Sequence, residues 1–153
     1  MVNIIRKIIV WRQSRINLEN RKRLINRTPT LVCSNCTGGV LYHWLGLKFQ
    51  SPFINLYMTN NDFIFAMENF DEFISTDIIE ECNSGKNYPI GIGFGGCRIY
   101  FMHYNTFEEA RQKWNERKQR IDKDNMAIWL TNFNSDNWGG RIGVGQKIQS
   151  TSF

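Results

Sequence analysis

The chain has 153 residues and a formal net charge of +5, and its 42% hydrophobic and 14% aromatic content fits one folded domain and excludes intrinsic disorder. No stretch reaches the roughly 20 consecutive apolar residues that a membrane-spanning helix needs. Four cysteines without a secretory signal pattern indicate reduced thiols, so we expect a cytoplasmic protein.

The positive charge is concentrated in the N-terminal segment. Residues 1–27 hold eight basic residues and one acid, a net charge of +7, whereas the remainder holds eleven basic and thirteen acidic residues, a net charge of −2. Ile4, Ile8 and Trp11 follow helical spacing, so we expect a basic amphipathic helix over residues 3–26. Two roles remain open for it: packing on its own domain or a partner, or lying on an anionic membrane, which would make the protein peripheral to the inner face of that membrane. We do not expect nucleic acid binding, because no aromatic residues are interleaved with the basic run.

After the N-terminal segment, the predicted elements alternate between strand and helix. We expect strands over residues 30–34, 52–57, 88–92, 98–104 and 125–131, and helices over 40–45, 61–74 and 106–120. N-cap residues open the last two helices, and Gly46 follows the first as a C-cap glycine.

The order of these elements predicts the fold class. Strands separated by helices indicate a parallel sheet, whereas the glycine turn between the strands at 88–92 and 98–104 indicates an antiparallel hairpin. We therefore expect an α/β fold with a mixed, mostly parallel sheet and flanking helices. The expected division is a helix over 1–27, a domain over 28–134 and a disordered, glycine-rich tail over 135–153.

Two motifs have the spacing of a cofactor or metal site but lack the structural context that such a site requires. Gly91, Gly93 and Gly96 match the dinucleotide fingerprint in spacing, but that fingerprint must open a helix, and here a strand follows. Cys33 and Cys36 have redox-motif spacing, but Cys33 lies inside a predicted strand, and no second pair completes a zinc site. We expect neither a cofactor nor a metal.

The strongest candidate site is the polar turn at residues 34–39. A strand-to-helix turn presents backbone N–H groups that favour an anion or a developing oxyanion, and a thiol there, Cys36, is expected to have a lowered pKa. His103, at the end of a strand, is the better candidate for a base, and His43 is the second. The alternative is that the turn residues only shape the chain and Cys36 is a small buried side chain. The candidate binding residues around the turn and at strand ends are Ser34, Asn35, Gly38, Gly39, Tyr104 and Asn132.

A second candidate site lies on the predicted helix over 106–120. Lys113, Arg117 and Arg120 follow helical spacing beside Trp114. One interpretation is an ordinary solvated helix face, in which these basic residues form ion pairs with glutamates one turn away. The alternative is that Arg117 and Arg120 bind a phosphate or an acidic sugar, with Trp114 packed nearby.

Three blocks of sequence resemble one family. They are Ser34-Asn-Cys-Thr-Gly-Gly39 with its continuation to Pro52, then Tyr88-Pro-Ile-Gly91, then Phe101-Met-His-Tyr104 with its continuation to Asn125. Over residues 28–134 they resemble the family named for domain of unknown function 1919, often labelled exopolysaccharide biosynthesis proteins. The resemblance implies a bacterial α/β protein associated with capsule or exopolysaccharide gene clusters, some of whose relatives are suspected of acyl transfer to surface glycans. It also implies that this chain is truncated at its C-terminal side, and so incomplete relative to the family.

Three functional hypotheses follow. The leading one is a protein of exopolysaccharide or capsule biosynthesis that modifies a glycan by acyl transfer, with Cys36 and His103 at its centre and a saccharide or a nucleotide- or lipid-linked glycan as partner. The second is a non-enzymatic scaffold of the polysaccharide assembly machinery on the membrane surface. The third is an inactive truncated homologue. The oligomeric state stays open.

Overall fold

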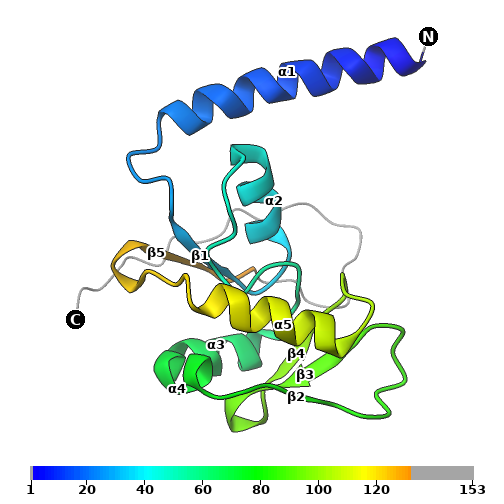
Figure 1. Cartoon of the computed structure of the whole chain (residues 1–153), viewed down its shortest axis with the longest axis vertical. Coiled ribbons are helices and arrows are strands. Elements are labelled where there is room, and N and C mark those ends of the chain that lie inside the picture. The colour runs from blue at the N-terminus through cyan, green and yellow to red at the C-terminus, as the bar shows by residue number, and fades with distance from the viewer. Residues whose placement is uncertain (1, 132–153) are drawn as a thin grey trace.

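The computed structural model describes residues 2–131, with α1 at one end of the molecule and α2 between it and a pair of strands (Figure 1). The helices are α1 (Val2–Lys22), α2 (Thr37–Leu45), α3 (Asn60–Glu68), α4 (Phe70–Ser75) and α5 (Phe107–Lys118). The strands are β1 (Thr30–Cys33), β2 (Ile79–Glu80), β3 (Ile90–Ile92), β4 (Arg98–Tyr100) and β5 (Met126–Trp129), and the short 3-10 turns are η1 (Phe94–Gly96) and η2 (Lys123–Asn125).

The strands form two small sheets. β1 and β5 pair in parallel, from Thr30 opposite Met126 to Cys33 opposite Trp129. β2, β3 and β4 form an antiparallel sheet in that order. The mixed α/β class is therefore confirmed, and so is the hairpin of β3 and β4, although the strands are divided between two sheets instead of lying in one largely parallel sheet.

An irregular segment, residues 52–59, links the two sheets. Tyr57 and Tyr100 exchange backbone hydrogen bonds of 2.9 and 2.8 Å, and the N–H of Met58 donates to the carbonyl of Ser34 at 2.9 Å. The expected strand over 52–57 is wrong because the backbone turns inside it. The N–H of Ile54 donates back to the carbonyl of residue 52, and Asn55 adopts a left-handed φ of 61°.

Most expected helix boundaries are confirmed. The Thr59 and Thr106 hydroxyls accept from the N–H groups three residues ahead, and Gly46 ends α2 with a left-handed φ of 59°. The single helix expected over 61–74 is two helices. It breaks at Asn69, whose side-chain amide donates to the carbonyl of Phe65 at 2.9 Å and competes with the backbone pattern.

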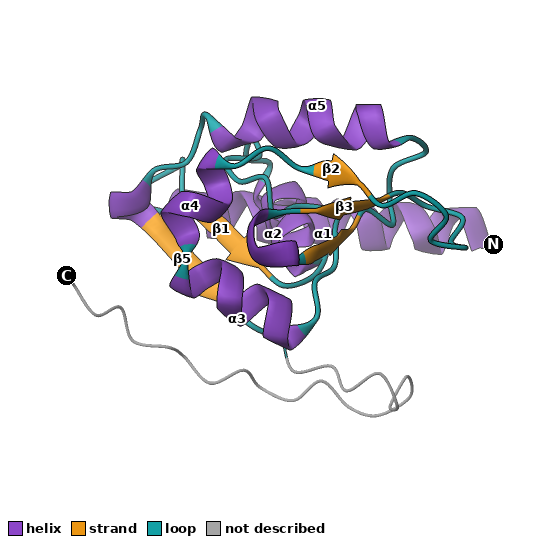
Figure 2. Ribbon diagram, turned by 90° about the horizontal axis from the view of Figure 1, so that it is seen from below, coloured by secondary structure: helices purple, strands orange, loops and turns teal. Residues whose placement is uncertain are grey.

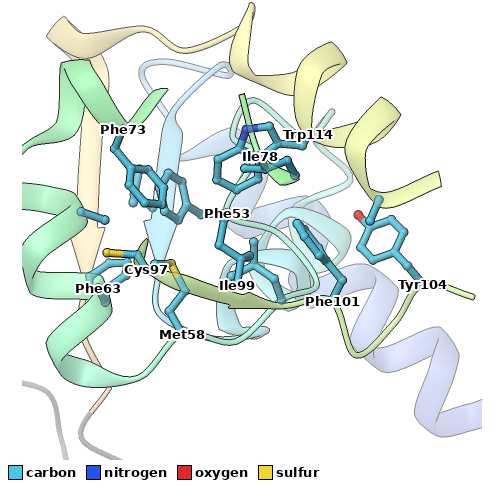
Figure 3. Packing of buried hydrophobic residues seen from close by; sticks show 14 residues of the cluster. Phe53, Met58, Phe63, Phe73, Ile78, Cys97, Ile99, Phe101, Tyr104 and Trp114 are labelled. Carbon is cyan, nitrogen blue, oxygen red and sulfur yellow. The ribbon is translucent and has the colours of Figure 1, made fainter. Parts of the chain in front are cut away.

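The hydrophobic core takes side chains from β1, residues 52–59, α3, α4, the antiparallel sheet and α5. α5 runs along one side of that sheet (Figure 2). Trp114 of α5 is 1% exposed, and its ring contacts those of Phe53, Phe73 and Phe101 at centroid distances of 5.3, 6.0 and 6.3 Å (Figure 3). Such aromatic pairs stabilise the fold by more than the burial of their apolar area alone. The core therefore fixes both α5 and the segment that follows β4. Within the described part of the chain, no helix is long and apolar enough to cross a bilayer.

Candidate functional site

Cys36 and His103 meet at the junction of the two sheets. Cys36 is the residue before α2, and its Sγ lies 3.0 Å from Nε2 of His103. The expected strand over 98–104 ends at Tyr100, so His103 lies in the turn that follows β4. The backbone hydrogen bonds of Tyr57 and Met58 hold the ends of β4 and β1 beside each other. This link is what brings together two side chains 67 positions apart in the sequence.

The thiol of Cys36 has a raised pKa. Burial is the main cause, and the residue's own backbone N–H lowers the pKa only in part. The expected lowering of the pKa is therefore wrong, because loss of water around the half-buried Sγ outweighs the hydrogen bond from the residue's own backbone N–H. At neutral pH the resting form is the thiol, so it needs a base to become a nucleophile. His103 is exposed and lies within hydrogen-bond reach of it.

Two backbone N–H groups of the turn already have partners. The N–H of Thr37 donates to Oδ1 of Asn35 at 2.9 Å, and the N–H of Gly38 points at the Cys33 sulfur and partly offsets its raised pKa. These two groups are therefore not free to bind an anion, contrary to the expectation for the turn. The backbone N–H of Cys36 itself lies next to the reactive sulfur.

Glycines let α2 pack tightly at its N-terminus. A Cβ on Gly38 would lie 3.0 Å from Sγ of Cys33, and one on Gly39 would lie 2.5 Å from Oδ1 of Asn55. Both distances are shorter than ordinary contacts, so these glycines allow the close approach of α2 to β1 and to residues 52–59. Their structural role is packing beneath the turn.

The carboxyl ends of β1 and β5 are tied together by side chains. Asn35 Nδ2 donates to the Thr131 hydroxyl at 2.8 Å, and the N–H of Thr131 donates to the Ser34 hydroxyl at 3.1 Å. Ser34 is buried and Asn35 half-buried, so the turn before Cys36 is held from two sides. Asn132, another candidate, lies outside the described residues.

His43 lies away from the Cys36–His103 pair. Seven residues along α2 correspond to about 10 Å of rise. His43 is exposed there and lines a shallow groove with Trp44 of α2 and with Ser14, Asn17, Leu18 and Arg21 of α1. It faces α1, and the structure brings only His103 to the thiol.

The candidate residues of α5 are tied to the protein itself. Arg117 is buried, donates to the Tyr104 hydroxyl at 2.8 Å and lies 5.0 Å from the centre of the Phe49 ring. Arg120 donates to the Phe49 carbonyl at 3.0 Å and forms an ion pair with Glu116. With Trp114 in the core, the expected exposed basic ridge is not formed.

Sequence patterns missed several groups around the thiol. Thr131, which lies two residues beyond the end of β5, was not named as a candidate, although ligands gather at the carboxyl ends of strands. The carbonyl of Leu56, 3.8 Å from the Cys36 sulfur, and the left-handed Asn55 have no sequence signal, because both depend on the irregular path of residues 52–59. Within residues 2–131, no group of three His, Cys, Asp or Glu side chains could hold a metal ion.

This arrangement defines an α/β protein with a thiol–imidazole pair at a strand-to-helix turn. Comparison with known proteins places the chain in a family: it belongs to the one described as domain of unknown function (DUF1919), whose model matches residues 7–138. It is also similar to an uncharacterized protein from Haemophilus influenzae (strain ATCC 51907 / DSM 11121 / KW20 / Rd). The two are 36% identical over 116 residues, which is 76% of this chain and 55% of the relative. The chain thus spans about half the length of that curated relative.

Proposed function

We propose that the protein transfers acyl groups to a bacterial exopolysaccharide or capsular glycan through a thioester on Cys36. The observation that supports this proposal is the 3.0 Å contact between Sγ of Cys36 and Nε2 of His103. A nucleophile within hydrogen-bond reach of a base is the minimal arrangement for covalent acyl transfer. The glycan acceptor follows from the resemblance of the sequence to exopolysaccharide biosynthesis proteins.

The reaction begins with the neutral thiol. As Sγ of Cys36 attacks the carbonyl carbon of an acyl thioester or ester donor, Nε2 of His103 takes the thiol proton. The tetrahedral intermediate collapses, the bond to the donor's thiol or alcohol breaks, and His103 returns the proton to that leaving group. A saccharide hydroxyl then attacks the acyl-cysteine, its proton passes to His103, and the cysteine thiol is restored when that proton reaches the departing sulfur.

Surrounding groups support these steps. The backbone N–H of Cys36 lies beside the sulfur and is the nearest donor for the oxyanion that forms on the acyl carbonyl. Two hydrogen bonds hold the turn in place: the N–H of Thr131 donates to the Ser34 hydroxyl, and Asn35 Nδ2 donates to the Thr131 hydroxyl. The exposure of His103 leaves an acceptor free access to the base.

A non-enzymatic interaction module is the second candidate. The raised pKa of Cys36 favours it, because the thiolate that most cysteine nucleophiles rely on is scarce in the resting protein. An inactive homologue would share this property.

The test compares three cysteine and histidine variants in the bacterium that carries the gene. Cys36→Ala and His103→Ala are expected to abolish ester-linked acyl groups on the extracted surface polysaccharide, measured by proton NMR. Cys82→Ala, which removes an exposed thiol elsewhere, is expected to leave them unchanged. Thermal melting of each purified variant checks that the fold is kept. Unchanged acylation with a folded Cys36→Ala protein would exclude the thioester route and favour the interaction module.

A further inference from the structure

The helix α1 exposes an unusual amount of apolar surface. Eight of its large hydrophobic side chains are between 47% and 65% exposed: Ile4, Ile5, Ile8, Ile9, Val10, Trp11, Ile16 and Leu18. Single exposed apolar residues are ordinary, but a contiguous set of this kind marks an interaction surface. Six of the eight lie from Ile4 to Trp11, so the apolar surface is densest in the first half of the helix.

The contact between α1 and its own domain lies on a different side of the helix. Ser14 and Arg21 of α1 line the groove against α2. At about 100° per residue, Ile5, Ile9 and Ile16 lie on nearly the opposite side of α1 from these two. The side of α1 that carries Ile5, Ile9 and Ile16 is therefore not used for packing against α2, whereas Leu18 also lines the groove. Figure 1 shows the N-terminal part of α1 extending past α2.

The charges on α1 favour an anionic partner. The helix holds six basic residues and one acid, a net charge of +5, and its acid Glu19 is paired with Lys22 at 2.8 Å. Arg6, Lys7 and Arg12 are exposed among the apolar residues. A second copy of the same helix would bring another +5 against this surface, so like-charge repulsion opposes self-association.

Trp11 has the geometry of an interfacial anchor. Its side chain is 60% exposed, and Cζ of Arg15 lies over its ring at 5.4 Å from the centroid. Tryptophan favours the boundary between lipid headgroups and acyl chains, and a neighbouring arginine can keep its charge among phosphates while its stem covers apolar surface. An anionic phospholipid bilayer supplies both parts that this pair requires, because its headgroups carry the negative charge and its acyl chains form the apolar side of the boundary.

We propose that α1 docks the protein on an anionic lipid bilayer, lying parallel to its plane with Ile4, Ile5, Ile8, Ile9 and Trp11 at the headgroup boundary. In this orientation α2 lies on the other side of α1 from the lipid. The C-terminal end of α2 packs near α1, so Cys36 lies at the end that points away (Figure 1). Nine helical residues span about 14 Å, which holds the thiol–imidazole pair clear of the bilayer surface.

Vesicle sedimentation of the full chain tests the docking. Binding is expected to vesicles of phosphatidylcholine mixed with phosphatidylglycerol and not to phosphatidylcholine alone, and added salt should weaken it. The double variant Ile5→Ser/Ile9→Ser should lower the binding constant by on the order of tenfold or more. Ile25→Ser/Ile79→Ser removes two isoleucines outside α1 that are more exposed than Ile5 and Ile9, and this variant should bind like the unchanged protein.

A charge series completes the test. Arg6→Gln/Lys7→Gln/Arg12→Gln should weaken binding to anionic vesicles, and Lys86→Gln/Arg111→Gln, two exposed cations elsewhere, should not. Equal binding to both vesicle types would overturn the anionic requirement. Absence of binding, or binding unaffected by Ile5→Ser/Ile9→Ser, would overturn the docking itself. A dimer in light scattering that this isoleucine pair disrupts, without vesicle binding, would assign the surface to a second copy. None of these measurements depends on acyl transfer.

Discussion

Gly39 lies where α2 comes closest to the irregular segment 52–59. A Cβ at this position would meet Oδ1 of Asn55 at 2.5 Å, a distance that forces a local shift. Gly39→Ala is therefore expected to lower the free energy of unfolding by about 1–3 kcal/mol, as overpacking usually does. Urea unfolding followed by circular dichroism measures the change.

The control for Gly39→Ala is a variant of Asn55, the residue that the new methyl group would meet. Asn55→Gly removes the amide that the new methyl group would meet, and glycine adopts the φ of 61° at position 55 without strain. In that background the cost of Gly39→Ala should fall. An equal cost in both backgrounds would show that Asn55 is not the source of the clash.

The buried thiol of Cys33 makes the free energy of unfolding depend on pH in the alkaline range. Burial raises the pKa of its thiol from an ordinary value of 9.0 to about 12. Between these values the unfolded chain loses the thiol proton and the folded chain keeps it, so stability is complete below pH 9 and falls as the pH rises towards 12. We expect Cys33→Ala to show a shallower fall of unfolding free energy over this range than the unchanged protein.

The slope with pH, not the absolute stability, is the quantity to compare, because Cys33→Ala also leaves a small cavity. Cys82→Ala is the matched control, since that thiol is already exposed to water in the folded protein. Parallel curves for all three proteins would show that Cys33 is not the group responsible.

Both partners of the Cys36–His103 pair could be named from the sequence. A thiol at a strand-to-helix turn and a histidine after a strand are recognisable residue types in recognisable places. The direction of the thiol's pKa could not be predicted, because it depends on how much of the sulfur the irregular segment covers. The hydrogen bonds that Asn35 and Cys33 accept from the turn's N–H groups could not be predicted either, because they depend on side-chain rotamers that no sequence pattern encodes.

At the scale of elements, Arg117 links α5 to the segments that follow β4 and α2. Its guanidinium joins the Tyr104 hydroxyl after β4 to the Phe49 ring after α2. Arg117→Met keeps the volume but removes the charge-assisted hydrogen bond and the ring contact, so we expect a loss of about 1–3 kcal/mol in unfolding free energy.

A matched variant on the same helix separates this role from helix propensity. Arg111→Met removes an exposed cation whose partner is Glu108, and a surface pair of this kind contributes little. Its effect should stay within about 0.5 kcal/mol. Chemical denaturation measures the free energy of unfolding of both variants. Equal decreases would contradict the stabilising role of Arg117.

The elements differ in how far the sequence determines them. Local chemistry determines helix ends, so Thr59, Thr106 and Gly46 were predicted as caps, and the glycine turn predicted the hairpin of β3 and β4. The segment 52–57 has strand-like composition, but its backbone is bent by Asn55 and bonded at Tyr57 to β4. Propensity describes such a segment poorly when tertiary packing decides its path.

For the whole molecule, the alternation of strands and helices was sufficient for the α/β class, but not for the division into two sheets. Which strands pair is a long-range property, and nothing near Thr30 in the sequence specifies Met126 as its partner. The N-terminal helix was predicted from its periodicity. Which of its sides meets α2 became visible only in the structure.

The pairing of β1 with β5 also determines when the reactive turn can form. Thr30 and Met126 are 96 positions apart, so closing this pair costs far more chain entropy than closing the β3–β4 hairpin. On the ribosome, β1 has no ladder partner until the codons for β5 have been translated and that strand has left the exit tunnel. The support that Thr131 gives to Ser34 and Asn35 cannot form before that point. Until then, the cysteine beside them belongs to an unfinished fold.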